Sequence, residues 1–292
     1  MVDTRQAGNR EEPRSLSMGA ENQLAFKAEV GHGSDMMSRV FITGSADGLG
    51  MAAAQALMSE GHEVVVHARS TSRAAVFDPI QDKLLGIVTG DLTSDAETRS
   101  IADQMNRIGK MDAVIHNAGI YLERERGNTP EGLAKILAVN VLAPYLLTVL
   151  IERPSRLIYL SSGMHQGGSS NLDDIDWAKR TWSAGQAYSE SKLYIAALSS
   201  AISARWPDVI TGSVNPGWVP TRMGGASAPD DLQMGHQTQT WLAASDEVTK
   251  RESGQYWYHR QPVRAAQEVT NPTFHERLTD KLEQLTGVVL PK

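Results

Sequence analysis

Tyr188 and Lys192 are the two residues of this sequence whose types and spacing most directly suggest acid–base chemistry. A helical pattern runs from about Ala187 to Ser203, and residues four apart on a helix lie on one face, one turn from each other. A free tyrosine, with a pKa of about 10, is a poor base at neutral pH, but a nearby ammonium stabilises the phenolate and lowers that pKa. Tyr188 is therefore predicted to exchange a proton with a carbonyl or alcohol oxygen near physiological pH.

A pair of serines could hold that same oxygen. Ser161 and Ser162 end a predicted strand that begins at Arg156. Serines at a strand end that faces the switch point of a parallel sheet are well placed to orient a substrate. Because side chains alternate along a strand, only one of the two hydroxyls can face the reaction.

Such groups need an element that positions a cofactor, and a glycine-rich turn predicts one. The apolar run Val40–Ile42 reads as a buried strand, and Met51–Glu60 as a helix that ends at a C′ glycine. Between them, Gly44 allows a tight turn, Gly48 allows a pyrophosphate close to the backbone, and Gly50 allows the helix to pack on the strand. The helix N-terminus attracts the anion. The alternative is a plain glycine turn between a strand and a helix.

The second strand, Glu63–Ala68, predicts which cofactor is preferred. NAD enzymes usually carry a carboxylate after this strand to bind the ribose 2′-OH. Here no acidic residue follows until Asp78, and Arg69 stands at the strand end with Arg73 nearby. A guanidinium can hold a 2′-phosphate with two hydrogen bonds, so NADP(H) is favoured over NAD(H). Arg69 could alternatively be an ordinary surface arginine.

Two further strand ends carry candidate residues. Leu84–Thr89 is a predicted strand followed by Asp91, with Ser94 as a plausible N-cap of a helix over Asp95–Ile108. Asp91 could serve that helix start as well as a ligand. The next strand, Asp112–His116, runs into a small-residue turn that can pass close to a flat ligand.

Asn140 lies among apolar residues of a predicted long helix, which we expect to start at a Thr129 cap with Pro130 in its first position. An unpaired amide would be costly there, so a hydrogen bond within the core is one explanation for Asn140. Pro144 predicts a bend in the helix.

In this order, the motifs resemble those of the short-chain dehydrogenase/reductase family, from the Thr-Gly-x-x-x-Gly-x-Gly turn at Thr43 to Asn-Pro-Gly-Trp-Val-Pro-Thr at Thr221. The resemblance implies that Tyr188 is the acid/base and that Lys192 lowers its pKa and binds the nicotinamide ribose. It also implies that Ser162 binds the substrate oxygen and that Asn140 opens its helix to hold a relay water. The implied cofactor contacts are Gly44, Ser45, Asp47, Gly48, Leu49, Gly50, Arg69, Asp91, Leu92, Asn117, Ala118, Gly119, Tyr188, Lys192, Pro216, Gly217, Val219 and Thr221.

Two departures from the family pattern stand out. His116 replaces the first Asn of the family's Asn-Asn-Ala-Gly motif, which puts the usual bracing of that turn in doubt. The gap between Ser162 and Tyr188 is about twice the family's length, and this insertion resembles the retinol-dehydrogenase-like branch. Within it, His165 could contact substrate or lie on the surface. The aspartates between Asn171 and Trp177 suggest a solvated acidic loop rather than a metal site, and no metal is expected.

The rest of the chain predicts the last strands of the sheet, a lid segment and a final helix. Ile210–Val214 is a predicted sixth strand, and Trp218 after it could line the substrate pocket or belong to the core. Gly224–Met234 reads as a mobile lid. Gly254–His259 reads as a last strand, and Asn271–Leu285 as a final amphipathic helix closed by a glycine.

Composition sets the class of protein. A net charge of −6 without a basic block gives no reason to expect nucleic acid or an anionic membrane as partner. Absence of cysteine excludes disulfides and a cysteine nucleophile and fits a cytoplasmic location, and no apolar run predicts a membrane helix. Residues 1–36 read as a poorly ordered extension, either incidental or regulatory, before one domain over 37–292.

We therefore expect a single doubly wound, Rossmann-like α/β domain, with a parallel sheet of about seven strands flanked by helices. The expected reaction is NADPH-dependent reduction of a ketone or aldehyde, or the reverse alcohol oxidation, on an apolar or aromatic small molecule. A binding protein of the same fold without catalysis is the alternative. A sugar-nucleotide epimerase is disfavoured by the glycine spacing and an enoyl reductase by the Tyr–Lys spacing. A homo-oligomer is possible.

Overall fold

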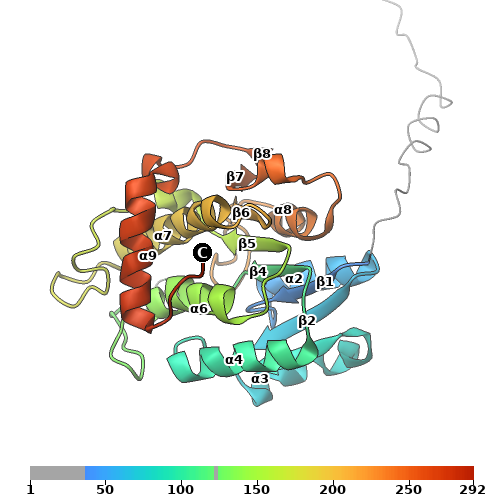
Figure 1. Ribbon diagram of the computed structural model, residues 1–292. Helices are drawn as coiled ribbons and strands as arrows, with labels where there is room; N and C mark the ends of the chain where they lie inside the picture. The colour runs from blue at the N-terminus through green and yellow to red at the C-terminus, as the bar shows by residue number, and fades with distance from the viewer. Residues whose placement is uncertain (1–36, 122–123) are drawn as a thin grey trace, which may run out of the picture. The chain divides into compact units, whose positions relative to one another are not determined.

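An eight-stranded sheet crosses the centre of the protein, with helices on both sides (Figure 1). The structure is a computed structural model that describes residues 37–121 and 124–292; the predicted extension lies outside them. The strand order is β3-β2-β1-β4-β5-β6-β7-β8, parallel except for the last pair. The strands are β1 (Arg39–Ile42), β2 (Glu63–Ala68), β3 (Gly86–Thr89), β4 (Ala113–His116), β5 (Arg156–Leu160), β6 (Ile210–Asn215), β7 (Gln255–Tyr258) and β8 (Gln261–Pro262). The doubly wound α/β prediction is confirmed, with one short antiparallel strand added.

Alternating side chains divide the apolar residues between two cores. In β1, Phe41 points to one face of the sheet, while Val40 and Ile42 point to the other; in β2, Val65 and Val64 separate in the same way. All five side chains are fully buried. Strands that are apolar on both faces must be covered by helices on both faces, which is why the chain folds in three layers.

The helices form the two covering layers. The first core packs under α4, α6, α7 and α9, and the second under α2 and α8 (Figure 1). The helical segments are α2 (Gly48–Ser59), α3 (Thr71–Ala74), η1 (Ala75–Lys83), α4 (Asp95–Ile108), α5 (Lys135–Leu137), η2 (Ala138–Leu142), α6 (Ala143–Leu150), η3 (Gly163–Gly167), α7 (Ala184–Arg205), α8 (Leu232–Ala244), η4 (Lys250–Glu252), η5 (Gln267–Thr270) and α9 (Pro272–Thr286).

The sheet order reverses between β1 and β4, and this reversal fixes where a ligand can enter. The chain leaves β1 toward β2 and β3 on one side and then returns to β4 and β5 on the other. Ligands of doubly wound sheets bind at the carboxyl ends of the strands beside such a reversal. The glycine turn, the small-residue turn and the two serines all follow strands on this edge.

The predicted start of the long helix at Thr129 is wrong. Thr129 accepts the backbone N–H of Leu133 with its hydroxyl at 3.2 Å and closes a turn instead of a helix. Gly132, at φ 84°, completes that turn, and the chain enters α5 only at Lys135. A distant partner holds the turn in place, because the Asp176 carboxylate accepts the N–H of Ala134 at 2.5 Å. Pro130 therefore lies in a turn and not at a helix N-terminus.

Two other boundaries differ from the predictions. The third strand begins at Gly86 rather than Leu84, and α7 begins at Ala184, ahead of the predicted start. The helix α8 was not predicted, and its first turn takes up the end of the segment expected to be a lid, Gly224–Met234. The final helix α9 has Asn271 as its N-cap and ends at Gly287 in the left-handed conformation, as the sequence predicts.

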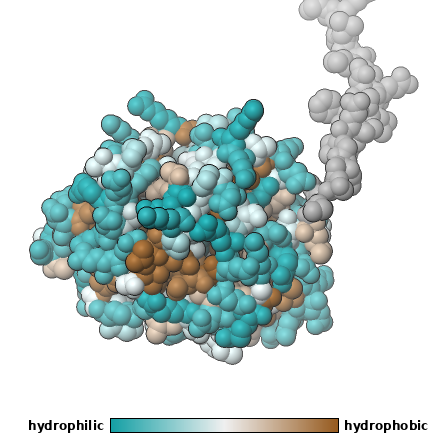
Figure 2. Space-filling view, in the orientation of Figure 1, coloured by the Kyte–Doolittle hydropathy of each residue, from teal (hydrophilic) through white to brown (hydrophobic). Residues whose placement is uncertain are grey.

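The surface in the view of Figure 2 is mostly hydrophilic, with one hydrophobic cluster over α6 and the C-terminal segment. That segment includes Val289, which is 68% exposed, and it is tied to the body of the protein. Its carbonyl groups accept hydrogen bonds from Tyr145, Arg205 and Trp206. Among the described residues, no helix is both long and apolar enough to cross a membrane.

Candidate active site

The turn after β1 approaches β4 so closely that side chains cannot fit between them. Gly44 has φ 64°, and a Cβ there would lie 2.9 Å from Ala118. A Cβ on Gly50 would lie 2.5 Å from the amide nitrogen of Asn117. Glycine is thus required at both positions, at the first for backbone conformation as well as space. The N-terminus of α2, with no acidic residue in its first turn, opens directly from this turn.

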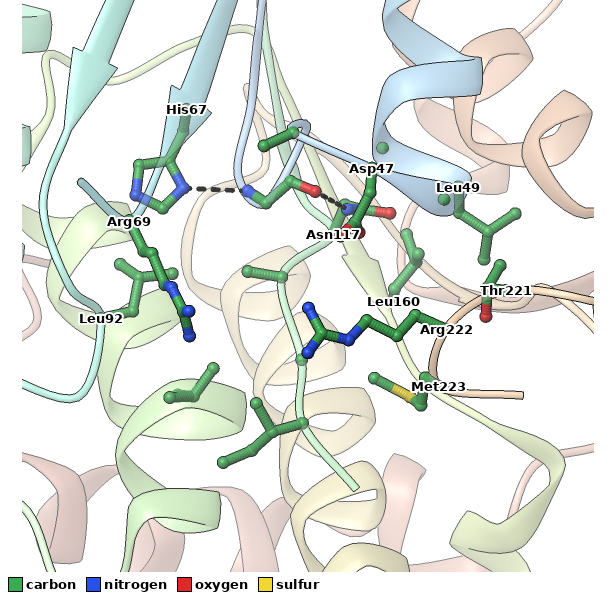
Figure 3. A pocket seen from close by; sticks show the side chains of 18 of the residues that line it. Asp47, Leu49, His67, Arg69, Leu92, Asn117, Leu160, Thr221, Arg222 and Met223 are labelled. Atoms are coloured by element: carbon green, nitrogen blue, oxygen red, sulfur yellow. Dashed lines mark hydrogen bonds between the residues drawn. The ribbon is translucent and has the colours of Figure 1, made fainter. Parts of the chain in front are cut away.

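The two turns are joined by three hydrogen bonds. The Asn117 amide donates to the carbonyl oxygen of Gly44 at 3.2 Å (Figure 3) and to that of Thr43 at 2.9 Å. The Ala118 N–H donates to the Thr43 hydroxyl at 3.0 Å. These bonds explain why the two motifs contain Thr43 and Asn117. The side chain of each residue binds the main chain of the other residue's turn.

His116, the departure from the family pattern, does not take part in this bracing. Its side chain is on the other side of the strand, where Nε2 is 3.1 Å from the Thr148 hydroxyl and the ring stacks on Tyr159. Burial lowers the pKa of His116 to about 3, so the ring is neutral. The turn is braced without it, and the doubt raised by His116 is resolved.

His67 is a site residue that the sequence analysis missed. Its Nδ1 accepts the N–H of Gly44 at 3.0 Å (Figure 3), and its Nε2 lies 2.9 Å from the carbonyl oxygen of Gly90. The ring must therefore carry its proton on Nε2. It links the carboxyl ends of β1, β2 and β3. In the sequence, His67 occupies an ordinary position of the strand β2. The one signal of its role is that the alternation of side chains along the strand directs it toward the glycine turn.

A cavity of about 470 Å³ extends along this edge, from the end of β3 to α7. Most of the residues predicted to contact a cofactor line it; they are Gly44, Asp47, Gly48, Leu49, Gly50, Arg69, Asp91, Leu92, Asn117, Ala118, Gly119, Tyr188, Lys192, Pro216 and Thr221. Three others do not line it, namely Ser45, Gly217 and Val219. Ser45 is fully buried, with its hydroxyl donating to the carbonyl of Ile42. Unpredicted lining residues are Ala46, His67, Arg73, Thr93, Ile120, Lys135, Val139, Leu160, Ser161, Arg222 and Met223.

Basic side chains dominate the charge of the cavity. Asp47 and Asp91 are its carboxylates, and its cationic residues are Arg69, Arg73, Lys135, Lys192 and Arg222. Arg73 pairs with Asp47 at 2.8 Å, which leaves Asp91 as the other acidic group. Asp91 accepts from the N–H and hydroxyl of Thr93, while Ser94 caps α4. Both roles considered for this segment are thus compatible. A cavity with excess positive charge favours an anionic ligand.

Arg69 and Arg222 extend into the cavity from opposite sides (Figure 3). Arg69 follows β2, and Arg222 comes from the segment after β6. Within the described part of the chain, neither guanidinium has an ion pair. The Arg222 segment touches the glycine turn, because a Cβ on Gly48 would meet the methyl group of Thr221 at 3.3 Å. Two unpaired arginines thus face the space beside the glycine turn.

Tyr188 and Lys192 lie together on α7 at the inner end of the cavity. The Lys192 Nζ is 5.5 Å from the centre of the Tyr188 ring and donates to the carbonyl of Leu160 at 2.8 Å. Burial raises the pKa of Tyr188 to about 12, against a smaller lowering by a hydrogen bond from Ser162. Burial also lowers the pKa of Lys192 to about 8. Burial is the largest influence on the pKa of Tyr188, and the expected lowering of this pKa by Lys192 stays a prediction.

The two serines have separate roles. Ser161 is buried and donates its hydroxyl to the carbonyl of Lys192 at 2.8 Å, which fixes α7 against β5. The Ser162 side chain instead lies close enough to the Tyr188 side chain to lower its pKa. Its hydroxyl oxygen also accepts the N–H of Met164 at 3.2 Å. The geometry therefore brings Ser162, and not Ser161, to the tyrosine hydroxyl.

Asn140 lies in η2, a π-helical turn between α5 and α6. Its side-chain oxygen accepts the N–H of Ile120 at 2.8 Å, and its amide donates to the Ile120 carbonyl and the Ser191 hydroxyl. The first explanation, a hydrogen-bonded amide within the core, is confirmed, and the helix opens locally, while the relay water stays a prediction. Because the side chain is occupied, a relay water would have to bind through a main-chain carbonyl that the π turn frees.

The insertion between Ser162 and Tyr188 is anchored to α7 by charge pairs. Glu190, whose side chain is 1% exposed, binds Arg180 through both oxygens and accepts from Trp177 at 3.0 Å. Asp174 pairs with Arg180, and Asp176 pairs with Arg126. The expectation of a solvated acidic loop is therefore wrong for these two aspartates, because their carboxylates pair with arginines and accept hydrogen bonds from backbone N–H groups. No group of three or more metal-ligating side chains occurs among the described residues.

Two open assignments are also settled by position. His165 is neither on the surface nor in contact with the cavity; it is buried and bonds to the main chain of Ser162. Trp218 is 57% exposed, so it does not belong to the core. The loop that carries it is closed by Asp230, whose carboxylate accepts the Trp218 N–H at 2.6 Å.

Comparison with known proteins gives a consistent family. A family model described as short chain dehydrogenase matches residues 38–232. Short-chain dehydrogenase chyC of Penicillium rubens is 37% identical, with 87% of this chain and 100% of that protein covered. DnrU of Streptomyces sp. strain C5, provisionally named a daunorubicin C-13 ketoreductase, is 31% identical over 89% of this chain and 94% of its own length. Human retinol dehydrogenase 13 is 26% identical, covering 86% and 85%.

A solved structure has the same fold. The crystal structure of an uncharacterised protein from Mycobacterium paratuberculosis superposes with a TM-score of 0.76 at 25% identity and covers 87% of this chain and 95% of that one. The relatives thus match over most of this chain.

Proposed function

The chain belongs to the short-chain dehydrogenase/reductase family of oxidoreductases, and from that membership we propose that it transfers hydride between NADPH and a ketone or aldehyde, or from a secondary alcohol in reverse. The observation that carries the proposal is that Tyr188 and Lys192 line a cationic cavity together, with Ser162 next to Tyr188. No other cluster of the described residues joins a proton donor, a hydroxyl and an ammonium beside such a cavity.

The residues present fit a dinucleotide phosphate. Glycine at positions 44 and 50 leaves a cradle that any Cβ would fill, and the α2 N-terminus supplies unbonded N–H groups beside it. Arg69 has no carboxylate partner and stands where the ribose 2′ position is expected, which supports NADP(H) over NAD(H). Arg222 adds a second cation at this edge. When bound, the nicotinamide supplies or accepts the hydride.

Tyr188 is proposed as the proton donor for reduction. With a pKa raised to about 12, its phenol is protonated at neutral pH, which is the form that reduction of a carbonyl requires. Lys192, with a pKa of about 8, is still largely an ammonium there and would stabilise the phenolate as it forms. Ser162 would hold the substrate oxygen beside the phenol, so that the proton moves along an existing hydrogen bond.

The substrate is proposed to be apolar or aromatic. Exposed apolar side chains follow the strands at the carboxyl edge of the sheet, with Met164 after β5 and Trp218 and Met223 after β6, and Met223 lines the same cavity as Tyr188. The ring of Tyr121, after β4, lies 4.4 Å from that of Tyr188. Exposed apolar side chains at a cavity mouth mark a contact surface for an apolar ligand.

Calorimetric titration with NADPH and separately with NADH tests the cofactor, and NADPH consumption with a panel of aryl ketones and aldehydes tests the reaction. We expect tighter binding of NADPH, turnover of at least one carbonyl compound, and a loss of about 100-fold or more in kcat for Tyr188→Phe. Tyr194→Phe is the matched control, because Tyr194 also lies on α7 but bonds the insertion at Ser169. Cofactor binding without turnover would favour the alternative, a non-catalytic dinucleotide-binding protein.

A further inference from the structure

The main-chain carbonyl oxygen of Ser162 is a point where two distant segments meet. It accepts hydrogen bonds from the Nδ1 of His165 at 2.8 Å, the N–H of His165 at 3.0 Å and the hydroxyl of Tyr256 at 2.8 Å. A carbonyl oxygen has two lone pairs, so three donors saturate it. The peptide group after Ser162 is consequently held against rotation.

The direction of the His165 bond follows from its second nitrogen. The N–H of Ala266 donates to Nε2 of His165 at 3.1 Å, so this nitrogen carries no proton in the neutral ring. The proton is then on Nδ1, which donates to Ser162. His165 is 1% exposed, and its ring packs on Tyr256 with centroids 4.2 Å apart. These contacts together fix both the rotamer and the tautomer of His165.

Tyr256 reaches the same carbonyl from β7, two strands away from β5. The side chain is 4% exposed, and burial raises its pKa, so the hydroxyl keeps its proton and donates. The hydroxyl lies close enough to Ser161 and Tyr188 for both to influence its pKa. Tyr256 is therefore next to the reacting group without lining the cavity.

We propose that His165 and Tyr256 are positioning residues that orient Ser162 for catalysis. The backbone at Ser162 is extended, with φ −163° and ψ 153°, and it fixes the Cα–Cβ direction that carries the hydroxyl to Tyr188. Loss of either donor lets the peptide rotate, and a displaced hydroxyl no longer holds the substrate oxygen in line with the phenol. This inference rests on the proposed reductase function.

The arrangement also gives the insertion a part in the reaction. His165 lies in η3, the first turn of the insertion, and Ala266 precedes η5 in the C-terminal part of the chain. Both segments are therefore connected to the catalytic serine through one imidazole, although neither contributes a side chain to the cavity at this point.

A double-mutant cycle separates this role from a general loss of stability. We expect Tyr256→Phe to lower kcat about 10-fold on a ketone that the wild type reduces, with the NADPH affinity unchanged. In a Ser162→Ala background the same substitution should have almost no further effect, because the group that it positions is gone. Tyr145→Phe is the control, since it removes a comparable buried bond, to Val288, that has no connection to Ser162. It should leave kcat unchanged.

His165 offers a second, independent comparison. His165→Asn keeps an N–H donor near the Nδ1 position, while His165→Leu removes it at similar volume. We expect the asparagine variant to retain most of kcat and the leucine variant to lose about 10-fold, again only when Ser162 is present.

The outcomes are decisive in both directions. A loss from Tyr256→Phe that is equally large with and without Ser162 would overturn the inference, as would unchanged kcat in both Tyr256→Phe and His165→Leu. In either case an active wild type would leave the reductase function standing. A wild type that binds NADPH but reduces no carbonyl compound would refute the proposed function itself and the inference with it.

Discussion

The N–H of Gly44 donates to the Nδ1 of His67 at 3.0 Å, so a strand side chain, and not only the glycines, shapes the phosphate-binding turn. The other nitrogen of the ring bonds the carbonyl of Gly90. Because Gly44 supplies a donor, only a neutral ring with an unprotonated Nδ1 can make this contact. The turn is thereby coupled to the protonation state of a buried histidine.

This coupling predicts a loss of stability in acid. Burial lowers the pKa of His67 below its usual 6.5. The unfolded chain then binds more protons than the folded one as the pH falls below about 6.5, so the free energy of unfolding decreases by up to about 1.4 kcal/mol per pH unit for each such group. The effect is absent above about pH 7, where both states carry a neutral ring.

His67→Asn should flatten that pH dependence, because its side-chain oxygen can accept from Gly44 and does not titrate. The variant should be less stable at neutral pH by about 1 kcal/mol, the cost of the lost bond to Gly90. Thermal unfolding between pH 5 and 8 measures both the pH dependence of stability and the stability difference at neutral pH. Parallel curves for the wild type and the variant would show that His67 does not contribute to acid sensitivity.

Sequence reasoning succeeded where the signal is local. The spacing of Tyr188 and Lys192 fixes their common helix face, and Ser94 was identified as an N-cap because the cap and its helix are contiguous. Glycines in a turn between a strand and a helix are informative for the same reason. The relative placement of Tyr188 and Ser162 followed from the strand order, since both must meet at the carboxyl edge of the sheet.

The failures involve partners that are distant in sequence. Thr129 looks like a helix cap, but the bond from Ala134 to Asp176 holds the segment in a turn. His165 could not be placed because the residue that binds its second ring nitrogen, Ala266, lies in the C-terminal part of the chain.

Lys192 predicts a pH limit on catalysis. Burial lowers its pKa to about 8, so the ammonium loses its proton as the pH rises through about 8. The phenolate of Tyr188 is then less stabilised, and kcat for ketone reduction should fall on the alkaline side. Lys192→Arg, which keeps its charge throughout, should be slower at neutral pH but show no such decline. The measurement is kcat from about pH 6 to 10; an identical decline in both enzymes would exclude Lys192 as its origin.

The Arg180–Glu190 pair should matter more for stability than pairs on the surface. Arg180→Met leaves a carboxylate that is 1% exposed without its cation, and we expect a loss of about 3 kcal/mol, the low end for such pairs because Arg180 itself is about one-third exposed. Glu63→Gln, which removes a partly exposed contact with Arg39, should cost less than about 1 kcal/mol. Urea unfolding compares them. Equal losses would mean that the insertion is not anchored by Glu190.

Arg69 and Arg222 should make different contributions to cofactor binding, because they enter the cavity from opposite sides. Arg69→Ala should weaken NADPH about 10- to 100-fold and leave NADH almost unchanged, since a 2′-phosphate is the group that distinguishes them. Arg222→Ala should weaken both cofactors equally, because its segment touches the glycine turn at Gly48, where the shared pyrophosphate is expected.

Calorimetry with NADPH, NADH and ADP-ribose separates the contributions of Arg69 and Arg222 to cofactor binding. The control is Arg107→Ala, on α4 outside the cavity. ADP-ribose carries the pyrophosphate without the 2′-phosphate, so only Arg222→Ala should weaken it. If Arg69→Ala weakened NADPH and NADH to the same degree, the 2′-phosphate assignment would fail while the catalytic assignment of Tyr188 remained. If Arg222→Ala changed neither cofactor, the unpaired guanidinium in the cavity would have to serve the substrate, and the KM for the ketone would then rise in that variant.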